Sequence, residues 1–390
     1  MKDFIYYAPT EVIFGKNALD KLGYCIKKYG TKVMLVYGKN SIIKSGLLGN
    51  IEKILKDENI PYILFGGAKP NPTLAHAEEG VKKAIEFEAD LIIGVGGGSA
   101  IDTAKAIAHG AANKEYQLWD IWTKKVEIQK SLAVGAILTI PAAGSEMSDS
   151  AVLTNEELGK KAGINTVFNR TKFAIMNPEY GFSVPKYQIA CGITDIMMHT
   201  LERYFIPDVQ ADLTDAIAEG LLRTVMKNGK RIYEDPTDYD AMSEVFWASS
   251  LSHNNLTECG RGKDFSVHKL GHVLSAKYDV THGASLSAVW GSWANYLYQK
   301  APKRFADYAR NVFGVKNDDD LEASKEGIMK TVSFFKSIDM PTSLSDLNIN
   351  ICEADFKKLA QAATLNDTLK LSRIMPLGAK EVEEIYRLAK

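Results

Sequence analysis

The chain has 390 residues, and its 47 lysines and arginines almost balance its 48 aspartates and glutamates, which leaves a net charge of −1. Hydrophobic residues make up 46% of the sequence, enough to bury a sizeable core, and this excludes a disordered chain. The absence of a basic excess or a basic stripe excludes nucleic acid and an anionic membrane as partners. At about 100 to 200 residues per domain, the length predicts two or three domains.

The cellular compartment is indicated by the cysteines and by the apolar stretches. The four cysteines lie far apart in the chain, at Cys25, Cys191, Cys259 and Cys352. This scatter, without any Cys-x-x-Cys pair, favours a reducing compartment. The first residues are charged and are not followed by an apolar run, so we expect no signal peptide. The most apolar stretch, 132–141, is about half the ~20 residues needed to cross a bilayer. We therefore expect a cytoplasmic protein that does not enter a membrane.

The first half of the chain alternates β-rich runs with helical patterns. Strands are predicted over 32–38, 62–65, 90–96 and 136–141, and helices over 47–59, 75–88 and 100–109. This β-α-β order predicts a parallel sheet covered by helices on both faces, with ligands at the carboxyl ends of the strands.

After about residue 185 the pattern changes to amphipathic helices with almost no strands. These helices are predicted over 187–204, 209–227, 239–251, 263–278 and 284–298. The sequence therefore predicts an α/β domain over 1–184 and an all-helical domain over 185–390, with a cleft between them.

A glycine-rich turn follows the predicted strand 90–96. It contains Gly97, Gly98 and Ser99, and a helix begins at once. Glycine allows close approach to a phosphate, and the free N–H groups of a helix start favour an anion. The match to the dinucleotide fingerprint G-x-G-x-x-G is imperfect, because Ser99 stands at the sixth position and the strand is the third along the chain. We therefore expect a nucleotide diphosphate here, but not an ordinary Rossmann dehydrogenase; the alternative is a tight turn without a ligand.

A second turn indicates which nucleotide would bind. Strand 32–38 ends in a polar, cationic segment containing Gly38, Lys39, Asn40, Ser41 and Lys44. A protein that selects NAD is expected to place an acid here for the ribose 2′-hydroxyl, and none is present. The segment suits a 2′-phosphate and favours NADP(H) over NAD(H); the alternative is a solvated loop with an incidental lysine.

Five of the seven histidines fall between His199 and His282. Asp195 and His199 are four residues apart on one predicted helix, as are His268 and His272 on another, so each pair shares a helix face. Three imidazole nitrogens and one carboxylate oxygen can hold a divalent metal, iron or zinc by ligand type. Spacing alone does not decide which of the last three histidines is not a ligand.

Taken together, these motifs resemble the iron-containing (group III) alcohol dehydrogenase family and, within it, the NADP-dependent butanol dehydrogenases. The motifs in family order are the opening 9–16, Gly96-Gly97-Gly98-Ser99 with Asp102, Asp195-x3-His199, and His268-x3-His272-x9-His282-Gly283. The resemblance covers essentially the whole chain. It implies an α/β dinucleotide-binding domain and an all-helical metal-binding domain like those of dehydroquinate synthase. It also implies the interconversion of primary, butanol-like alcohols and aldehydes with NADP(H).

The same resemblance implies roles for particular residues. The metal ligands would be Asp195, His199, His268 and His282, with iron as the metal and zinc as the alternative. His272 would then lie near the nicotinamide and relay a proton. Further cofactor contacts would be Asn71, Thr139, Ser145 and Lys161, besides Asp102 and the glycine turn. Segment 142–146 is shorter than the Thr-Thr-rich form of many relatives, as in the butanol dehydrogenase branch.

The substrate pocket, the alternative functions and the oligomeric state are predicted as follows. Phe246, Trp247, Trp290 and Trp293 suggest an apolar wall for a short unbranched substrate. The rival hypotheses are a polyol dehydrogenase, a metal-dependent synthase of the dehydroquinate type, a metallohydrolase, and a nucleotide sensor with a structural metal. By resemblance, we expect a homodimer whose contact includes segment 4–14.

Overall fold

A computed structural model describes residues 1–207 and 209–390. The chain divides into two compact units, one formed by Tyr7–Val184 and the other by Pro185–Lys390 together with Met1–Tyr6. The first unit is an α/β structure and the second is helical, which confirms the predicted fold class. The first six residues group with the helical unit rather than with the α/β unit.

The α/β unit is built on a six-stranded parallel sheet. Its strands are β1 (Glu11–Phe14), β2 (Val33–Tyr37), β3 (Tyr62–Phe65), β4 (Leu91–Gly96), β5 (Ala133–Leu138) and β8 (Phe173–Met176), in the order β1-β8-β5-β4-β2-β3. The helices between them are α1 (Leu22–Tyr29), α2 (Ser41–Lys44), α3 (Leu47–Asp57), α4 (Leu74–Phe87), α5 (Gly98–Ala112) and α6 (Leu118–Trp122). All pairings within this sheet are parallel.

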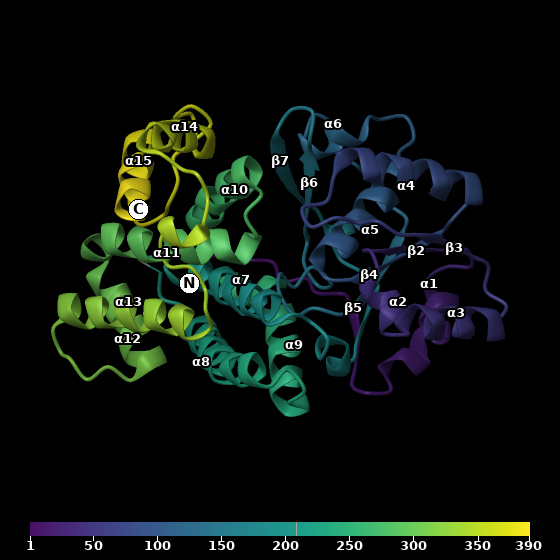
Figure 1. Ribbon diagram of the computed structural model, residues 1–390, viewed down its shortest axis with the longest axis horizontal. Coiled ribbons are helices and arrows are strands. Elements are labelled where there is room, and N and C mark those ends of the chain that lie inside the picture. The colour runs from purple at the N-terminus through teal and green to yellow at the C-terminus, as the bar shows by residue number, and fades with distance from the viewer. Residues whose placement is uncertain (208) are drawn as a thin grey trace. The chain divides into compact units, whose positions relative to one another are not determined.

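The strands are apolar on both sides, so both faces of the sheet are covered. Along β2, Val33 and Leu35 enter one core with α1 and α3, whereas Met34 and Val36 enter another with α4 and α5. Figure 1 shows α4 and α5 on one side of the sheet and α1 and α3 on the other. Side chains alternate along a strand, and this double burial is the reason the strands read as continuous apolar runs.

The two turns identified in the sequence, after β2 and after β4, lie next to each other at the carboxyl ends of these strands. Strands β2 and β4 are neighbours, with Tyr37 paired to Val95. After β2 the chain continues outward to β3, and after β4 it continues in the opposite direction to β5. Doubly wound sheets bind ligands at such a switch point, outside the carboxyl ends of the strands. Gly38 and Gly97 therefore begin adjacent loops at the position expected for a nucleotide.

Parts of this unit differ from the expectation, including β8, which was not among the predicted strands. The glycine turn follows the fourth strand, not the third, because Glu11–Phe14 pairs with β8 as an edge strand. An antiparallel hairpin that was not predicted, β6 (Ser150–Asn155) and β7 (Lys160–Asn165), forms a separate sheet. Strand β6 alternates buried and half-buried residues and β7 is mostly exposed or half-buried, unlike the apolar strands of the main sheet.

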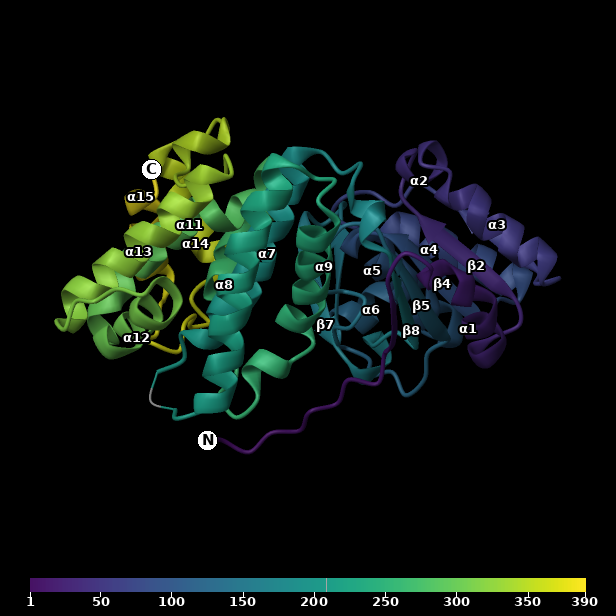
Figure 2. The ribbon, with the colours of Figure 1, turned by 90° about the horizontal axis from the view of Figure 1, so that it is seen from below.

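The second unit is a set of packed helices. They are α7 (Lys186–Tyr204), α8 (Asp212–Glu234), α9 (Tyr239–His253), α10 (Ser266–Tyr278), α11 (His282–Leu297), α12 (Pro302–Phe313), α13 (Asp320–Ser337), α14 (Glu353–Ala363) and α15 (Ala379–Leu388). The five predicted helical ranges correspond to α7 to α11. Helices α7, α8 and α9 lie side by side (Figure 2). Helices α7 and α11 are buried along most of their lengths and form the centre of this unit. No helix within residues 1–207 and 209–390 combines the length and apolarity needed to cross a membrane.

Candidate metal and nucleotide sites

The carboxylate of Asp195 lies at the centre of a histidine cluster in the helical unit. Its Oδ1 is 3.3 Å from His199 Nε2, 3.6 Å from His268 Nε2 and 3.6 Å from His282 Nε2. Asp195, His268 and His282 each offer one ligand atom, and these three atoms lie within 4.8 Å of one another. Helices α7, α10 and α11 supply the four side chains. The structure thus brings together all four residues that the resemblance implied as ligands.

The chemistry of this donor set fits a divalent metal. One carboxylate oxygen and three imidazole nitrogens are ligands typical of zinc and of iron. The Nδ1–H group of His268 donates to Glu202, and its Nε2 is buried without a hydrogen-bond partner among the residues that the structure describes. A histidine bonded in this way through one nitrogen presents the other to a metal.

Burial and neighbouring charges perturb the histidines. Burial lowers the pKa of His199 well below its usual value, and the adjacent His253 and His268 lower it further. For His268 burial also disfavours the charge, but Glu202 and Asp195 together outweigh it and raise the pKa to about 9. Strong opposing shifts within one cluster are typical of functional sites.

A glycine allows α11 to approach α7 closely at this site. A Cβ added at Gly283 would lie 2.3 Å from the carbonyl oxygen of Cys191 and 2.7 Å from its Cα. Cys191 stands one turn before Asp195 on α7, and His282 directly precedes Gly283. Side chains at this contact would force the helices apart, so the glycine determines how near His282 comes to Asp195.

His272 lies beside the cluster but is not centred on Asp195. Its ring centroid is 6.0 Å from that of His268 and 5.2 Å from that of His282. The side chain is only partly buried. His272 thus lies next to His268 and His282; its place near the nicotinamide and its role as a proton relay stay predictions.

Two further residues lie at the cluster: His253, which the sequence placed among the five clustered histidines without a role of its own, and Phe265, which was not identified. His253, at the end of α9, stacks on His199 with ring centroids 3.8 Å apart. Phe265 precedes α10 with a left-handed backbone (φ 62°), and its ring meets His268 edge-on at 5.0 Å. A bulky residue in this conformation is a strained position of the kind that concentrates at functional sites.

The aromatic wall expected from the sequence is wrong for three of its four residues. Phe246, Trp290 and Trp293 are fully buried in the helical core, and Trp293 packs against Phe205. Trp247 lies on the surface with 41% of its area exposed. Helical periodicity does not distinguish a core aromatic from one that faces a ligand.

In the α/β unit, the glycine turn connects β4 directly to α5. Gly94 has no room for a side chain, because a Cβ there would lie 2.7 Å from Ile101 Cα. Gly96 has φ 149°, a conformation that favours glycine. Gly97, Gly98 and Ser99 then begin α5 and are only partly buried. The start of a long helix with open glycines suits an anion such as a diphosphate.

The turn after β2 is polar and open. Lys39, Asn40, Ser41 and Lys44 are exposed. The backbone around Gly38 is fixed by the loop after β3, since Gly38 O accepts a hydrogen bond from Gly67 N at 2.8 Å. This exposed, cationic turn therefore begins at the switch point, where β2 and β4 end side by side.

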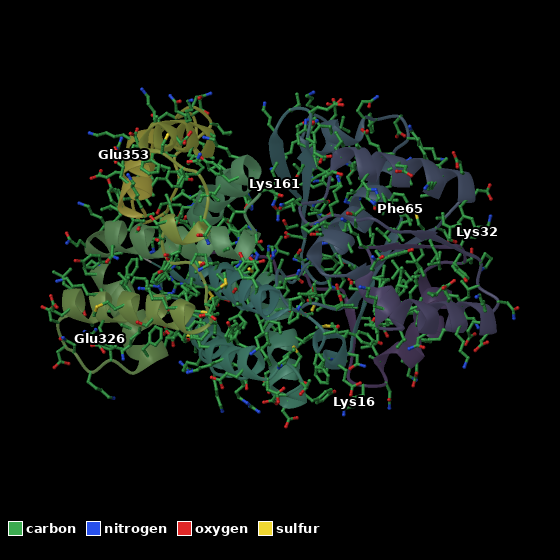
Figure 3. The ribbon with its side chains drawn as sticks, in the orientation of Figure 1. Lys16, Lys32, Phe65, Lys161, Glu326 and Glu353 are labelled. Carbon is green, nitrogen blue, oxygen red and sulfur yellow. The ribbon has the colours of Figure 1, made fainter. Side chains whose placement is uncertain are left out.

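The remaining predicted cofactor residues form three groups. Lys161, on β7 and labelled in Figure 3, donates from Nζ to Asn71 Oδ1 at 2.8 Å. Thr139, at the end of β5, donates its backbone N–H to Gly96 O at 3.0 Å and so borders the glycine turn. Asp102 and Ser145 are both buried, and the Ser145 hydroxyl donates to Asp102 Oδ1 at 2.6 Å. Contacts of all these residues with a nucleotide stay predictions.

Comparisons with known proteins match the chain over almost its whole length. Residues 9–178 match the iron-containing alcohol dehydrogenase family, and residues 189–390 match the C-terminal part of the same family. The chain is 38% identical to NADH-dependent butanol dehydrogenase A of Clostridium acetobutylicum, over 99% of both chains. It is 32% identical to the NADPH-dependent aldehyde reductase YqhD of Escherichia coli, over 90% of both.

A solved structure agrees with this assignment. The crystal structure of NADH-dependent butanol dehydrogenase A from Thermotoga maritima superposes with a TM-score of 0.95 at 35% identity, covering 100% of this chain and 99% of that one. The relatives named here differ in their nucleotide, NADH for two and NADPH for one. The family assignment does not favour the metallohydrolase or the nucleotide sensor. The chain belongs to the iron-containing alcohol dehydrogenase family and is an NAD(P)-dependent alcohol dehydrogenase that interconverts alcohols and aldehydes.

Proposed function

We propose that this enzyme interconverts short primary alcohols, of the butanol type, and their aldehydes with NADP(H) and a divalent metal, iron in preference to zinc. The observation that carries the proposal is the approach of three histidine Nε2 atoms to within 3.3 to 3.6 Å of Asp195 Oδ1. The named butanol dehydrogenases and the aldehyde reductase among its relatives support the substrate class.

In this proposal Asp195, His199, His268 and His282 hold the metal. When bound, the metal polarises the alcohol or carbonyl oxygen, and the nicotinamide exchanges a hydride with the carbon. Glu202 keeps the proton of His268 on Nδ1, which directs Nε2 to the metal. His272 receives the proton of the alcohol on its imidazole and passes it to solvent, which its partial exposure permits.

The α/β unit would bind the nucleotide. Its diphosphate would lie against the N-terminus of α5 at Gly97, Gly98 and Ser99. Lys39 and Lys44 would face the 2′-phosphate of NADP(H), because the turn after β2 carries exposed cations and no acid. Asn71, Thr139 and Lys161 would line the remainder of the cofactor site.

The assignment extends to assembly and compartment. We assign nucleotide binding to residues 1–184 and metal binding to 185–390, and we propose a homodimer whose contact includes segment 4–14. We also propose a cytoplasmic location, which the scatter of the four cysteines along the sequence favours. Light scattering at several protein concentrations tests the dimer.

The proposal is tested by following nicotinamide absorbance with purified enzyme reconstituted with Fe²⁺ or Zn²⁺. Butanal should be reduced at a higher kcat/KM with NADPH than with NADH. With NADPH, the kcat/KM for butanal should also exceed that for polyol-derived aldehydes or sugar phosphates. A preference for NADH would overturn the nucleotide assignment, and a preference for polyols would overturn the substrate class. Full activity in a rigorously metal-free preparation would overturn the role of the metal.

A further inference from the structure

Helix α5 carries a buried ion pair directly behind the glycine turn. Asp102 and Lys105 are three residues apart, so both side chains project from one face of the helix. Lys105 has no exposed surface and Asp102 is 7% exposed. The Lys105 Nζ atom lies 3.8 Å from Asp102 Oδ1. A lysine is rarely buried completely, because burying an ammonium group is costly unless hydrogen bonds compensate it.

The ammonium group of Lys105 is fully engaged by one loop. Nζ donates to Ser145 O at 2.8 Å, to Ser145 Oγ at 2.9 Å and to Ser150 O at 2.8 Å. An ammonium has three N–H donors, so all of them are used. Asp102 holds the same loop through its two oxygens, which accept from Ser145 Oγ at 2.6 Å and from Val152 N at 2.9 Å. The pair therefore fastens segment 145–152 to α5.

The segment that leads into this loop, 140–145, packs against the glycine turn. A Cβ added at Gly98 would lie 3.7 Å from Ala143 Cβ and 3.8 Å from Ser145 Cβ. A Cβ added at Gly97 would lie 3.4 Å from Ile140 Cβ. The distance between the loop and the turn consequently sets the space above the first residues of α5, where a phosphate would have to fit.

We propose that Lys105 is a positioning residue for nucleotide binding, which acts through Ser145 to hold segment 140–145 at the distance from Gly97 and Gly98 that a diphosphate requires. The inference rests on the proposed nucleotide site. Lys105 itself would not touch the nucleotide, because its donors are occupied. Lys105 belongs to none of the sequence motifs described above.

The electrostatic setting is consistent with a cation at this position. Burial lowers the pKa of Lys105 to about 8, although Asp102, Glu146 and Asp149 favour its charged form, and Arg170 opposes it. Burial likewise raises the pKa of Asp102. Against this cost of burial, the three oxygen acceptors around Nζ match the three donors of an ammonium group.

The test is the substitution Lys105→Met, which keeps the side-chain length and removes the ammonium group. The dissociation constant for NADPH and NADH is measured by nucleotide fluorescence on metal-free protein, well below the melting temperature. We expect binding to weaken by about tenfold to a hundredfold, the loss that charged hydrogen bonds typically represent. Metal affinity of the histidine cluster should be unchanged, and a purely structural role would leave the nucleotide dissociation constant unaltered.

The matched control is Lys83→Met, which removes an exposed lysine of α4 that forms an ion pair with Glu79. It should leave nucleotide binding unchanged. If Lys105→Met does not fold, Lys105→Gln retains donors for Ser145 and should show a smaller loss of affinity. If the folded Lys105 variant bound nucleotide with wild-type affinity, the role of Lys105 would be overturned but the proposed function would stand. If the wild-type protein bound neither nucleotide, the proposed function itself would be overturned.

Discussion

Glu202 holds His268 at two points: its Oε2 accepts the imidazole Nδ1–H, and its Oε1 accepts the backbone N–H of the same residue at 3.2 Å. The carboxylate is 1% exposed, so water does not compete for these bonds. Glu202 thereby sets both the tautomer and the orientation of a proposed ligand without being a ligand itself.

Replacing Glu202 with Gln should weaken metal binding by about tenfold to a hundredfold, because outer-shell partners of metal-binding histidines typically contribute that much. Competition with a chelator of known affinity measures the change. The control is Glu219→Gln, since Glu219 is a buried carboxylate that bonds Tyr204 and Asn311 rather than a histidine. Equal metal affinity in the Glu202 variant and the wild type would contradict the role of Glu202.

His268→Ala should remove the metal and the activity together, because the site would lose one of four proposed ligands. Nucleotide binding, which we place on the α/β unit, should persist. Metal content by elemental analysis and nucleotide fluorescence on the same preparation measure both. Retention of full activity and metal would show that His268 is not a ligand.

Gly283→Ala should damage the metal site although it changes no ligand. The added Cβ would clash with the backbone of Cys191, and relief by moving α11 would carry His282 away from Asp195. We expect a loss of about 1 to 3 kcal/mol in stability, as for overpacking elsewhere, together with weaker metal binding. Gly220→Ala in α8 is the control, because there the nearest atom, Arg223 NH2, lies 3.9 Å away. Thermal melting and metal titration distinguish the two variants.

Lys39→Asp should weaken NADPH binding by about tenfold, because it replaces an attractive charge with a repulsive one beside the proposed 2′-phosphate. NADH has no phosphate there and should be affected much less. Lys82→Asp makes the same charge reversal at an exposed position of α4 and serves as the control. Equal effects of Lys39→Asp on both nucleotides would place the 2′-phosphate elsewhere.

His272→Ala should slow turnover by about a hundredfold, a typical contribution of one proton-transferring group, while metal content stays unchanged. Added imidazole should restore part of the rate. The pH profile of kcat, compared between variant and wild type, reports the missing group. Loss of metal in this variant would mean that the assignments of His268 and His272 must be exchanged.

The fold class could be predicted from the sequence because buried parallel strands leave a strong signal. The runs at β2 and β4 are apolar on both faces, and each is followed by a segment with a helical pattern. Strand β1 was missed because it has only four residues and lies half-exposed at the edge of the sheet. The β6–β7 hairpin was missed because Lys160 and Lys161 interrupt its pattern.

The candidate metal site was only partly predictable. Helical spacing identified Asp195 with His199 and His268 with His272, but it did not choose among the last three histidines. That choice depends on which nitrogens approach Asp195 in space, and for His282 on the absence of a side chain at Gly283. A residue that positions other residues, as we propose for Lys105, is harder to identify from the sequence. Lys105 is one charged residue in a segment rich in alanine.

The pairing of the first residues with the helical unit affects how the protein can be divided. Lys2 N donates to Gly260 O, and Asn254 donates to the Tyr6 hydroxyl. The α/β unit is thus one uninterrupted stretch of chain. The helical unit consists of two stretches, one before and one after the α/β unit in the sequence. A gene fragment for residues 7–184 would encode a complete unit, but a fragment beginning at 185 would omit a segment that its own unit contains. Separate production of the helical unit therefore calls for a circular permutation or a linker that joins Tyr6 to Pro185.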